Sequence, residues 1–159
     1  MIRLVPMDEN DFARYLARAI PRRAERYAAR GVWKEERALE TSRQLYAQLL
    51  PQGASTPHQH FVRIVESATE ASVGEAWYRT EEVGGVVQFW IEWITIEPEH
   101  RRKGYASAAL DLLEQEARRL GATRTGLDVW SDNPGAFELY RKQGYRTIRQ
   151  SLVKPLDDQ

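Results

Sequence analysis

The segment "EPEHRRKGYASAALDLLEQEARRLGA", residues 97–122, joins a basic loop to the start of a long amphipathic helix. Arg101, Arg102, Lys103 and Gly104 stand directly before that helix. The first turn of a helix ordinarily favours an Asp, Ser, Thr or Asn cap and acidic residues, because its free N–H groups carry partial positive charge. Cations and a glycine at this position therefore indicate that an anion from outside the chain binds there.

A phosphate group is the anion that this loop suits best. Phosphate oxygens need several convergent N–H donors, which a helix start supplies. Gly104 would let the backbone approach the anion closely, and Ala106 is nearly as small. A solvated basic loop remains the alternative on these residues alone. The segment is neither a Walker loop nor a dinucleotide fingerprint, because Gly-Lys-Ser/Thr and G-x-G-x-x-G are both absent.

The composition limits the class of protein. A chain of 159 residues is long enough for one domain, residues 1–159, and 42% hydrophobic residues predict that it folds by itself. Lys+Arg and Asp+Glu both number 23, so the basic excess typical of nucleic-acid partners is missing. Without cysteine there is no disulfide, thiol nucleophile or thiolate metal site. We find no signal peptide or membrane-spanning run and expect a cytoplasmic protein without a membrane partner.

The hydrophobic pattern predicts a mixed α/β protein. Helices are expected from Asp8 or Asn10 to Gly31, broken or kinked at Pro21, and over residues 33–50. Strands are expected at 2–6, 61–67, 72–80 and 86–97, with a hairpin turn at Gly84-Gly85. The helix of 97–122 is followed by a strand at 124–131, a short helix at 133–144 and one or two strands at 145–156. The run "PRRAERYAAR", residues 21–30, is interpreted as a solvated helix face rather than a nucleic-acid surface.

Two further segments accompany the basic loop. "ITIEP" (residues 94–98) precedes it, and "VWSDNPGAFELYRKQGY" (residues 129–145) follows the next strand. Together these residues resemble the GNAT superfamily of acyl-CoA-dependent N-acyltransferases. That family shows an Ile/Val-x-Val-x-Pro strand end, then Arg/Gln-x-x-Gly-x-Gly/Ala, and later an Asn, an Ala and a Tyr before a Gly-Phe/Tyr pair. The resemblance is close over residues 91–146 and extends over the chain through the order of elements.

The resemblance implies a GNAT fold, with a mixed, mostly antiparallel sheet of roughly six to seven strands, one splayed strand pair and about four helices. It implies an N-acetyltransferase that uses acetyl-CoA to acetylate a primary amine of a small molecule, peptide or protein. A non-catalytic acyl-CoA-binding regulatory module is the alternative. A nucleic-acid-binding domain using the same basic loop would require steeply salt-dependent binding. A homodimer through sheet edges or C-terminal strands would also be typical of the family.

The resemblance also assigns cofactor-binding residues. The strand end would pair with the pantetheine arm and the loop would hold the pyrophosphate; the residues concerned are Ile94, Thr95, Ile96, Arg101, Arg102, Lys103, Gly104, Tyr105, Ala106 and Ser107. Asn133 and Ala136 would contact the pantetheine amides, and Tyr140 would protonate the leaving thiolate. From the residues alone, Asn133 could equally cap the helix that starts at Pro134, and Tyr140 could be a core aromatic.

Direct acyl transfer needs a base for the amine and a donor for the developing oxyanion, but no enzyme nucleophile. By resemblance, the donor is a backbone N–H near Ile96. Our prediction for the base is Glu92, which shares a face with Ile94 and Ile96 if the strand is regular. A bulge would change that facing, an exposed structural carboxylate is the alternative, and Glu75 is the reserve candidate.

We expect the site that binds the acceptor amine to lie near Trp33, His58, His60 and Trp130. "LLPQGASTPHQHF" (residues 49–61) resembles a segment of small bacterial GNAT proteins, and two histidines two residues apart would face the same way on a strand. No third ligand with suitable spacing accompanies them, so we predict no metal site. Entry into a strand, or hydrogen bonding within the fold, is the alternative role for both histidines.

Overall fold

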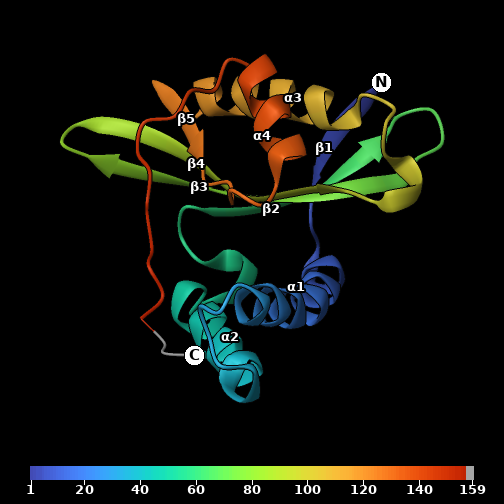
Figure 1. Cartoon of the computed structure of the whole chain (residues 1–159). Coiled ribbons are helices and arrows are strands. Elements are labelled where there is room, and N and C mark those ends of the chain that lie inside the picture. The colour runs from blue at the N-terminus through green and yellow to red at the C-terminus, as the bar shows by residue number, and fades with distance from the viewer. Residues whose placement is uncertain (157–159) are drawn as a thin grey trace. The chain divides into compact units, whose positions relative to one another are not determined.

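The structure is a computed structural model that describes residues 1–156. The chain divides into two compact units, Met1–Leu127 and Asp128–Gln159 (Figure 1). Within the described residues, no helix has the length and apolar character needed to cross a membrane.

The first unit is built on a sheet of five strands in the order β1-β2-β3-β4-β5. Their bounds are β1 Ile2–Pro6, β2 Gln59–Glu66, β3 Ser72–Val83, β4 Val86–Ile96 and β5 Arg124–Leu127. Neighbouring strands are antiparallel except β4 and β5, which are parallel. Gly84 and Gly85 form the turn between β3 and β4 with φ of +58° and +80°. A two-residue hairpin with two positive φ angles needs glycines, which confirms the predicted turn.

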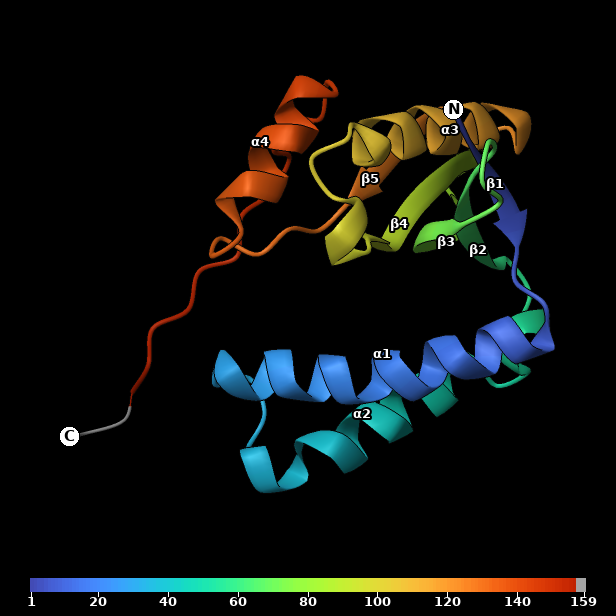
Figure 2. The ribbon, with the colours of Figure 1, turned by 90° about the vertical axis from the view of Figure 1, so that its right-hand side faces the viewer.

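Helices cover both faces of this sheet (Figure 2). Helices α1 (Glu9–Ala29) and α2 (Glu35–Leu49) pack on one face, and α3 (Tyr105–Arg119) packs on the other. The first core contains Phe12, Tyr15, Tyr46, Phe61 and Trp77. The second core contains Ile2, Ile64, Val73, Ile96 and Ala109. Short 3₁₀ helices, η1 (Gly53–Ser55) and η2 (Pro98–His100), precede β2 and α3.

Helix α1 is one continuous helix, so a break at Pro21 is wrong, and a kink there stays a prediction. A proline inside a helix removes one hydrogen bond, but the buried residues Tyr15, Ala19 and Ala24 anchor both halves to the same core. Tertiary packing therefore outweighs the local penalty. Gly31, with φ of +69°, follows the C-terminus, as predicted for the end of this helix.

The start of α1 is fixed by a capping box. The Asp8 side chain accepts a hydrogen bond from Asp11 N (2.7 Å), and the Asp11 carboxylate accepts one from Asp8 N (3.2 Å). We expect Asp8→Ala to lower the free energy of unfolding by about 1 kcal/mol, because Asp11 N in the first turn loses its side-chain acceptor. Lys34→Ala is the matched control, since Lys34 caps α2 without a side-chain hydrogen bond. Equal urea-unfolding midpoints for the two variants would contradict the assigned role of Asp8.

The second unit contains α4 (Pro134–Lys142). No strand forms at residues 145–156, and the described residues contain five strands in total, so the expected number of six to seven is wrong. Ile148, Leu152 and Val153 are 73% to 94% exposed. Strand propensity stabilises a strand only where a neighbouring edge pairs with it, and none does so here. The strand predicted at 124–131 likewise ends at Leu127.

Candidate functional site

Strand β4 extends beyond its pairing with the shorter strand β5. These strands pair only from Gln88–Arg124 to Ile91–Leu127. On its other side, β4 stays paired with β3 as far as Ile96. Among the described residues, the β4 stretch from 92 to 96 therefore has a strand partner on one side only. The splayed strand pair that the family resemblance implies stays a prediction, because β5 is paired with β4 over its whole length, Arg124–Leu127.

The free edge of β4 presents main-chain hydrogen-bonding groups. Glu97 N–H donates to Val73 O (2.8 Å), so those two residues form a hydrogen-bonded pair with β3. Such pairs alternate along antiparallel strands, which turns the N–H and C=O groups of Ile96 and Ile94 away from β3. Arg101 Nε donates to Ile96 O (3.0 Å), in agreement with this direction. The N–H and C=O of Ile94 and the N–H of Ile96 are thus directed to the open side.

A β-bulge at Glu92 changes the facing of this strand. Trp77 pairs with Trp93 and Tyr78 with Ile91, so Glu92 is an extra residue in β4. The prediction that Glu92 shares a face with Ile94 and Ile96 is therefore wrong. Ile94 and Ile96 belong to the core beneath α3.

The Glu92 carboxylate instead lies on the face that α1 and α2 cover. It accepts a hydrogen bond from Arg79 Nε (2.5 Å). Arg79 lies two residues after Trp77 on β3, and residues two apart on a strand share a face. Trp77 belongs to the core with α1 and α2. The inserted residue is the physical reason, since it breaks the two-residue period on which the facing was predicted.

Glu75 lies on the same face and is 4% exposed. It pairs in register with Thr95, beside the open stretch of β4. Arg18 Nη2 donates to its carboxylate (2.7 Å), and Arg22 lies 3.6 Å away. Burial raises the pKa of Glu75 and the charge of Glu97 raises it further, whereas the two arginines act in the opposite direction. The net result is a raised pKa, and a higher pKa makes the carboxylate a stronger proton acceptor once it is ionised.

The basic loop leads from β4 to an uncapped helix start. Arg102 and Gly104 both have positive φ, +63° and +82°. Gly104 is the N-cap of α3, makes no side-chain cap, and is followed by a first turn without acidic residues. In contrast, Asp8 caps α1 and Asn133 caps α4. The first-turn N–H groups of a helix lack intrahelical acceptors, so those of α3 are available to a ligand.

These features fit the diphosphate of coenzyme A. Residues 101–104 are exposed, and a Cβ at Gly104 would meet nothing within 4 Å. The loop therefore combines open space and main-chain donors with neighbouring cationic residues, as an anion site at a helix start requires. Tyr105 anchors the first turn by donating its hydroxyl hydrogen to Glu66 of β2.

Four candidate residues lie in the second unit. The Asn133 side chain accepts a hydrogen bond from Ala136 N (3.3 Å), which confirms its role as a helix cap and leaves its cofactor contact a prediction. The Tyr140 ring packs edge-on against Tyr145, with ring centroids 5.8 Å apart. Trp130 is 38% exposed.

The proposed acceptor residues of the first unit lie in separate places. Trp33, in the connection between α1 and α2, packs against Tyr27 with the rings tilted by 46° and their centroids 4.5 Å apart. His58 lies in a turn with φ of +65°, because β2 begins only at Gln59. The expectation that both histidines face one way on a strand is therefore wrong.

His60 is integrated into the face under α3. Its ring stacks on Tyr78 with centroids 4.9 Å apart, and Tyr78 donates its hydroxyl hydrogen to Glu116 (3.4 Å) near the C-terminus of α3. Burial lowers the pKa of His60. This position lies at the end of α3 opposite Gly104. Within residues 1–156, no group of three or more His, Asp or Glu side chains is arranged to hold a metal ion.

Comparison with known proteins decides the family. The sequence model of the acetyltransferase (GNAT) family matches residues 28–145. The chain belongs to the GNAT family. It is 32% identical over 155 residues to the uncharacterized N-acetyltransferase YycN of Bacillus subtilis, covering 98% of this chain and 99% of YycN. The uncharacterized N-acetyltransferase YdgE of the same organism is 30% identical, with coverages of 96% and 97%.

Solved structures give the same result for the fold. The crystal structure of B. subtilis YycN superposes with a TM-score of 0.92 at 31% identity, covering 99% of this chain and all of that one. An acetyl transferase from Pyrococcus furiosus superposes with a TM-score of 0.70 at 23% identity, covering 98% and 100%. The second likeness concerns the fold alone. Together they establish the GNAT α/β fold for this protein.

A row of arginines beside the GNAT strand β4 was missed by the sequence analysis. Arg22 and Arg26 lie over the Trp93 ring, with guanidinium carbons 3.9 Å and 5.1 Å from its centroid. The interpretation of residues 21–30 as a solvated helix face is therefore wrong for these side chains. Their four-residue spacing was the available signal, because it puts them on one side of a helix. The sequence does not show that this side faces the sheet.

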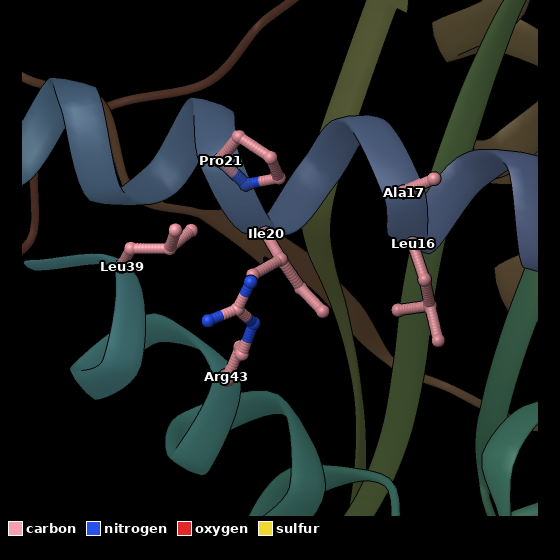
Figure 3. A pocket seen from close by; sticks show the side chains of 6 residues that line it. All are labelled: Leu16, Ala17, Ile20, Pro21, Leu39 and Arg43. Carbon is pink, nitrogen blue, oxygen red and sulfur yellow. The ribbon is translucent and has the colours of Figure 1, made fainter.

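An apolar cavity of about 180 Å³ lies between α1 and α2 (Figure 3). Its lining residues are Leu16, Ala17, Ile20, Pro21, Leu39 and Arg43. None of them belongs to β4, the basic loop or α3. The cavity is thus separate from the features that relate this chain to cofactor binding in the GNAT family.

Proposed function

We propose that this GNAT protein transfers the acetyl group of acetyl-CoA directly to a primary amine. The observation that carries the proposal is the continuity of the open β4 edge with the uncapped, basic start of α3. An open edge of main-chain donors and acceptors suits the amides of pantetheine, and the helix start suits a diphosphate. Family membership supports the same cofactor.

The cofactor-binding roles follow from these directions. The N–H and C=O groups of Ile94 pair with the pantetheine arm as one strand pairs with another. The first-turn N–H groups of α3, after Gly104, hold the diphosphate, and Arg102 and Lys103 add positive charge. Arg101 has a positioning role, because its Nε is bonded to Ile96 O and fixes the loop to the end of β4. Asn133 and Ala136 remain our candidates for further pantetheine contacts.

Acetyl-CoA supplies the activated acyl group, and the chain supplies the proton transfers. The amine lone pair attacks the carbonyl carbon, a C–N bond forms, and the C–S bond breaks with its electron pair on sulfur. Tyr140 gives the sulfur a proton, and a carboxylate takes the proton that the amine loses. The N–H of Ile96 stabilises the negative charge that develops on the carbonyl oxygen. No covalent enzyme intermediate is needed, which suits a chain without cysteine.

We assign Glu75 as the general base, which accepts the proton of the amine directly or through a water molecule. Glu75 is buried beside Thr95, and its pKa is raised. Glu92 remains the second candidate, although its carboxylate is held by Arg79 at 2.5 Å. Glu92 is the extra residue of the β4 bulge, whereas Glu75 is in register with Thr95.

A coupled assay tests the proposed function. Purified protein is mixed with acetyl-CoA and a panel of amines, free thiol is measured, and the acetylated amine is identified by mass spectrometry. We expect thiol and acetylated amine to appear in equal amounts, with background thiol release when the amine is omitted. Calorimetric binding of acetyl-CoA without turnover on any amine would favour the regulatory module. Absence of both binding and turnover would refute the proposal.

A further inference from the structure

One side of helix α1 projects arginines toward the sheet at β4. Arg18, Arg22 and Arg26 are spaced by four residues, so they form a row along the helix. Arg18 contacts Glu75, Arg22 contacts both Glu75 and Trp93, and Arg26 contacts the Trp93 ring. Cation–π contacts hold the last two guanidinium groups over one aromatic face. The row therefore ends above Trp93.

Negative charge is scarce along this row. Glu75 is shared between Arg18 and Arg22, and Glu97 lies 3.6 Å from Arg18. Within residues 1–156, no carboxylate lies within 4 Å of the guanidinium of Arg26 or Arg23. Burial lowers the pKa of Arg26, and repulsion from Arg30, Arg22 and Arg23 lowers it further. These half-buried cations thus lack the counter-charge that such groups ordinarily have.

The indole N–H of the neighbouring Trp93 also lacks a hydrogen-bond partner. Trp93 Nε1 is buried and has no hydrogen-bond acceptor among the described residues. A buried donor without an acceptor is uncommon in native proteins and calls for an explanation. Unmatched donors and unmatched positive charge occur together here. Both would be satisfied by a ligand that brings negatively charged oxygen atoms.

The row lies close to the place assigned to the reaction. Trp93 directly precedes Ile94, whose main-chain groups are directed to the open edge of β4. One residue of strand spans about 3.3 Å, so Trp93 and the reacting end are separated by a few bond lengths. Glu75, which we assign as the base, contacts the same arginines. An acceptor with its amine near Glu75 would bring its other end to Arg22 and Arg26.

We propose that the acceptor is a small amine that also carries a carboxylate or phosphate, and that Arg26, with Arg22, binds this oxyanion above Trp93. The inference rests on the proposed acetyl transfer and specifies its substrate class. Polyamines and other dications are disfavoured, because the row already holds unpaired positive charge. Neutral amines lose the charge-assisted hydrogen bonds that a guanidinium makes with an oxyanion.

A matched set of acceptors tests the substrate class. Glycine carries a carboxylate, O-phosphoethanolamine carries a phosphate, ethanolamine carries neither, and spermidine is a polycation. We expect kcat/KM to be about tenfold to hundredfold higher for one or both oxyanion-bearing amines than for ethanolamine, the range given by one charged hydrogen bond. The better of the two distinguishes a carboxylate from a phosphate site. Preference for spermidine or ethanolamine would overturn the inference.

Variants test the assigned residue. Arg26→Gln should raise KM for the oxyanion-bearing acceptor about tenfold to hundredfold, with little change in KM for acetyl-CoA. Arg26→Lys should recover part of the loss, because it restores the charge but not the bidentate geometry. Arg37→Gln is the matched control, since Arg37 is an exposed arginine on α2. Equal KM values for Arg26→Gln and Arg37→Gln would refute the role of Arg26.

A binding measurement separates this inference from the proposed function. Thermal unfolding is followed while inorganic phosphate replaces chloride at constant ionic strength. Phosphate at the Gly104 loop contributes equally to the wild type and Arg26→Gln, so the difference between them reports the Arg26 site. Loss of stabilisation in Arg26→Gln without turnover of any amine would refute acetyl transfer and support the oxyanion site. Equal stabilisation of both proteins would refute that site.

Discussion

Gly104→Val is expected to weaken acetyl-CoA binding by about 100-fold or more while the protein remains folded. Gly104 has φ of +82°, a conformation that β-branched residues strongly disfavour. The substitution should rotate the loop out of this conformation and misalign the first-turn N–H groups of α3. Loss of about two charge-assisted hydrogen bonds to the diphosphate accounts for an effect of this size. Isothermal titration calorimetry with acetyl-CoA measures it.

Gly121→Val provides a control on the same helix. Gly121 follows the C-terminus of α3, also has φ of +82°, and its Cβ would likewise meet nothing within 4 Å. The two substitutions should therefore lower the free energy of unfolding by similar amounts, about 1–2 kcal/mol. Only Gly104→Val should lose cofactor affinity. If Gly104→Val binds acetyl-CoA as tightly as Gly121→Val, the loop is not the diphosphate site.

The features predicted correctly from sequence depend on local chemistry. Gly84-Gly85 specifies its hairpin because few other residues adopt two successive positive φ angles. The start of α3 could be recognised because glycine and cations stand where a helix start ordinarily favours a polar cap and acidic residues. In each case a few neighbouring residues determine the structure.

The features that were missed depend on distant parts of the chain. The bulge at Glu92 appears only when Trp93 and Ile91 are paired with β3, and the sequence of β4 does not show which residue is extra. Pro21 stays helical because distant residues complete the core on both sides of it. Arg22 and Arg26 face Trp93 because α1 packs on the sheet in one particular rotation. No local pattern contains that rotation.

The bulge also affects the choice of general base, for which we expect Glu75→Gln to lower kcat about 100-fold or more. The loss corresponds to removing a positioned proton acceptor. Acetyl-CoA affinity should stay near that of the wild type, because Glu75 lies on the face opposite the core of Ile94 and Ile96. Stopped-flow or steady-state thiol release at saturating acetyl-CoA measures the change. Wild-type kcat in Glu75→Gln would exclude Glu75 as the base.

The raised pKa of Glu75 also predicts the direction in which the pH dependence of kcat/KM is shifted. A base acts only when ionised, and burial raises the pKa of Glu75 above the ordinary value of 4.5, so the acid limb of kcat/KM should lie above that value in the wild type. The acid limb of kcat/KM should disappear in Glu75→Gln.

The raised pKa also means that Glu75 contributes stability below pH 4.5 that is lost as the pH rises through this raised pKa. Replacing it by neutral glutamine should therefore not unfold the protein in a neutral assay.

Glu92→Gln is the necessary comparison, because both carboxylates lie on the α1 face and each contacts arginine. If Glu75 is the base, Glu92→Gln keeps the acid limb and most of kcat, since it removes mainly the hydrogen bond from Arg79. If Glu92 is the base, the results are reversed: Glu92→Gln loses the limb and Glu75→Gln retains it. The two carboxylates differ in burial, since the side chain of Glu75 is 5% exposed and that of Glu92 is 23% exposed. Glu75 has a raised pKa and lies opposite Thr95, in the stretch of β4 that pairs with a strand on one side only among residues 1–156.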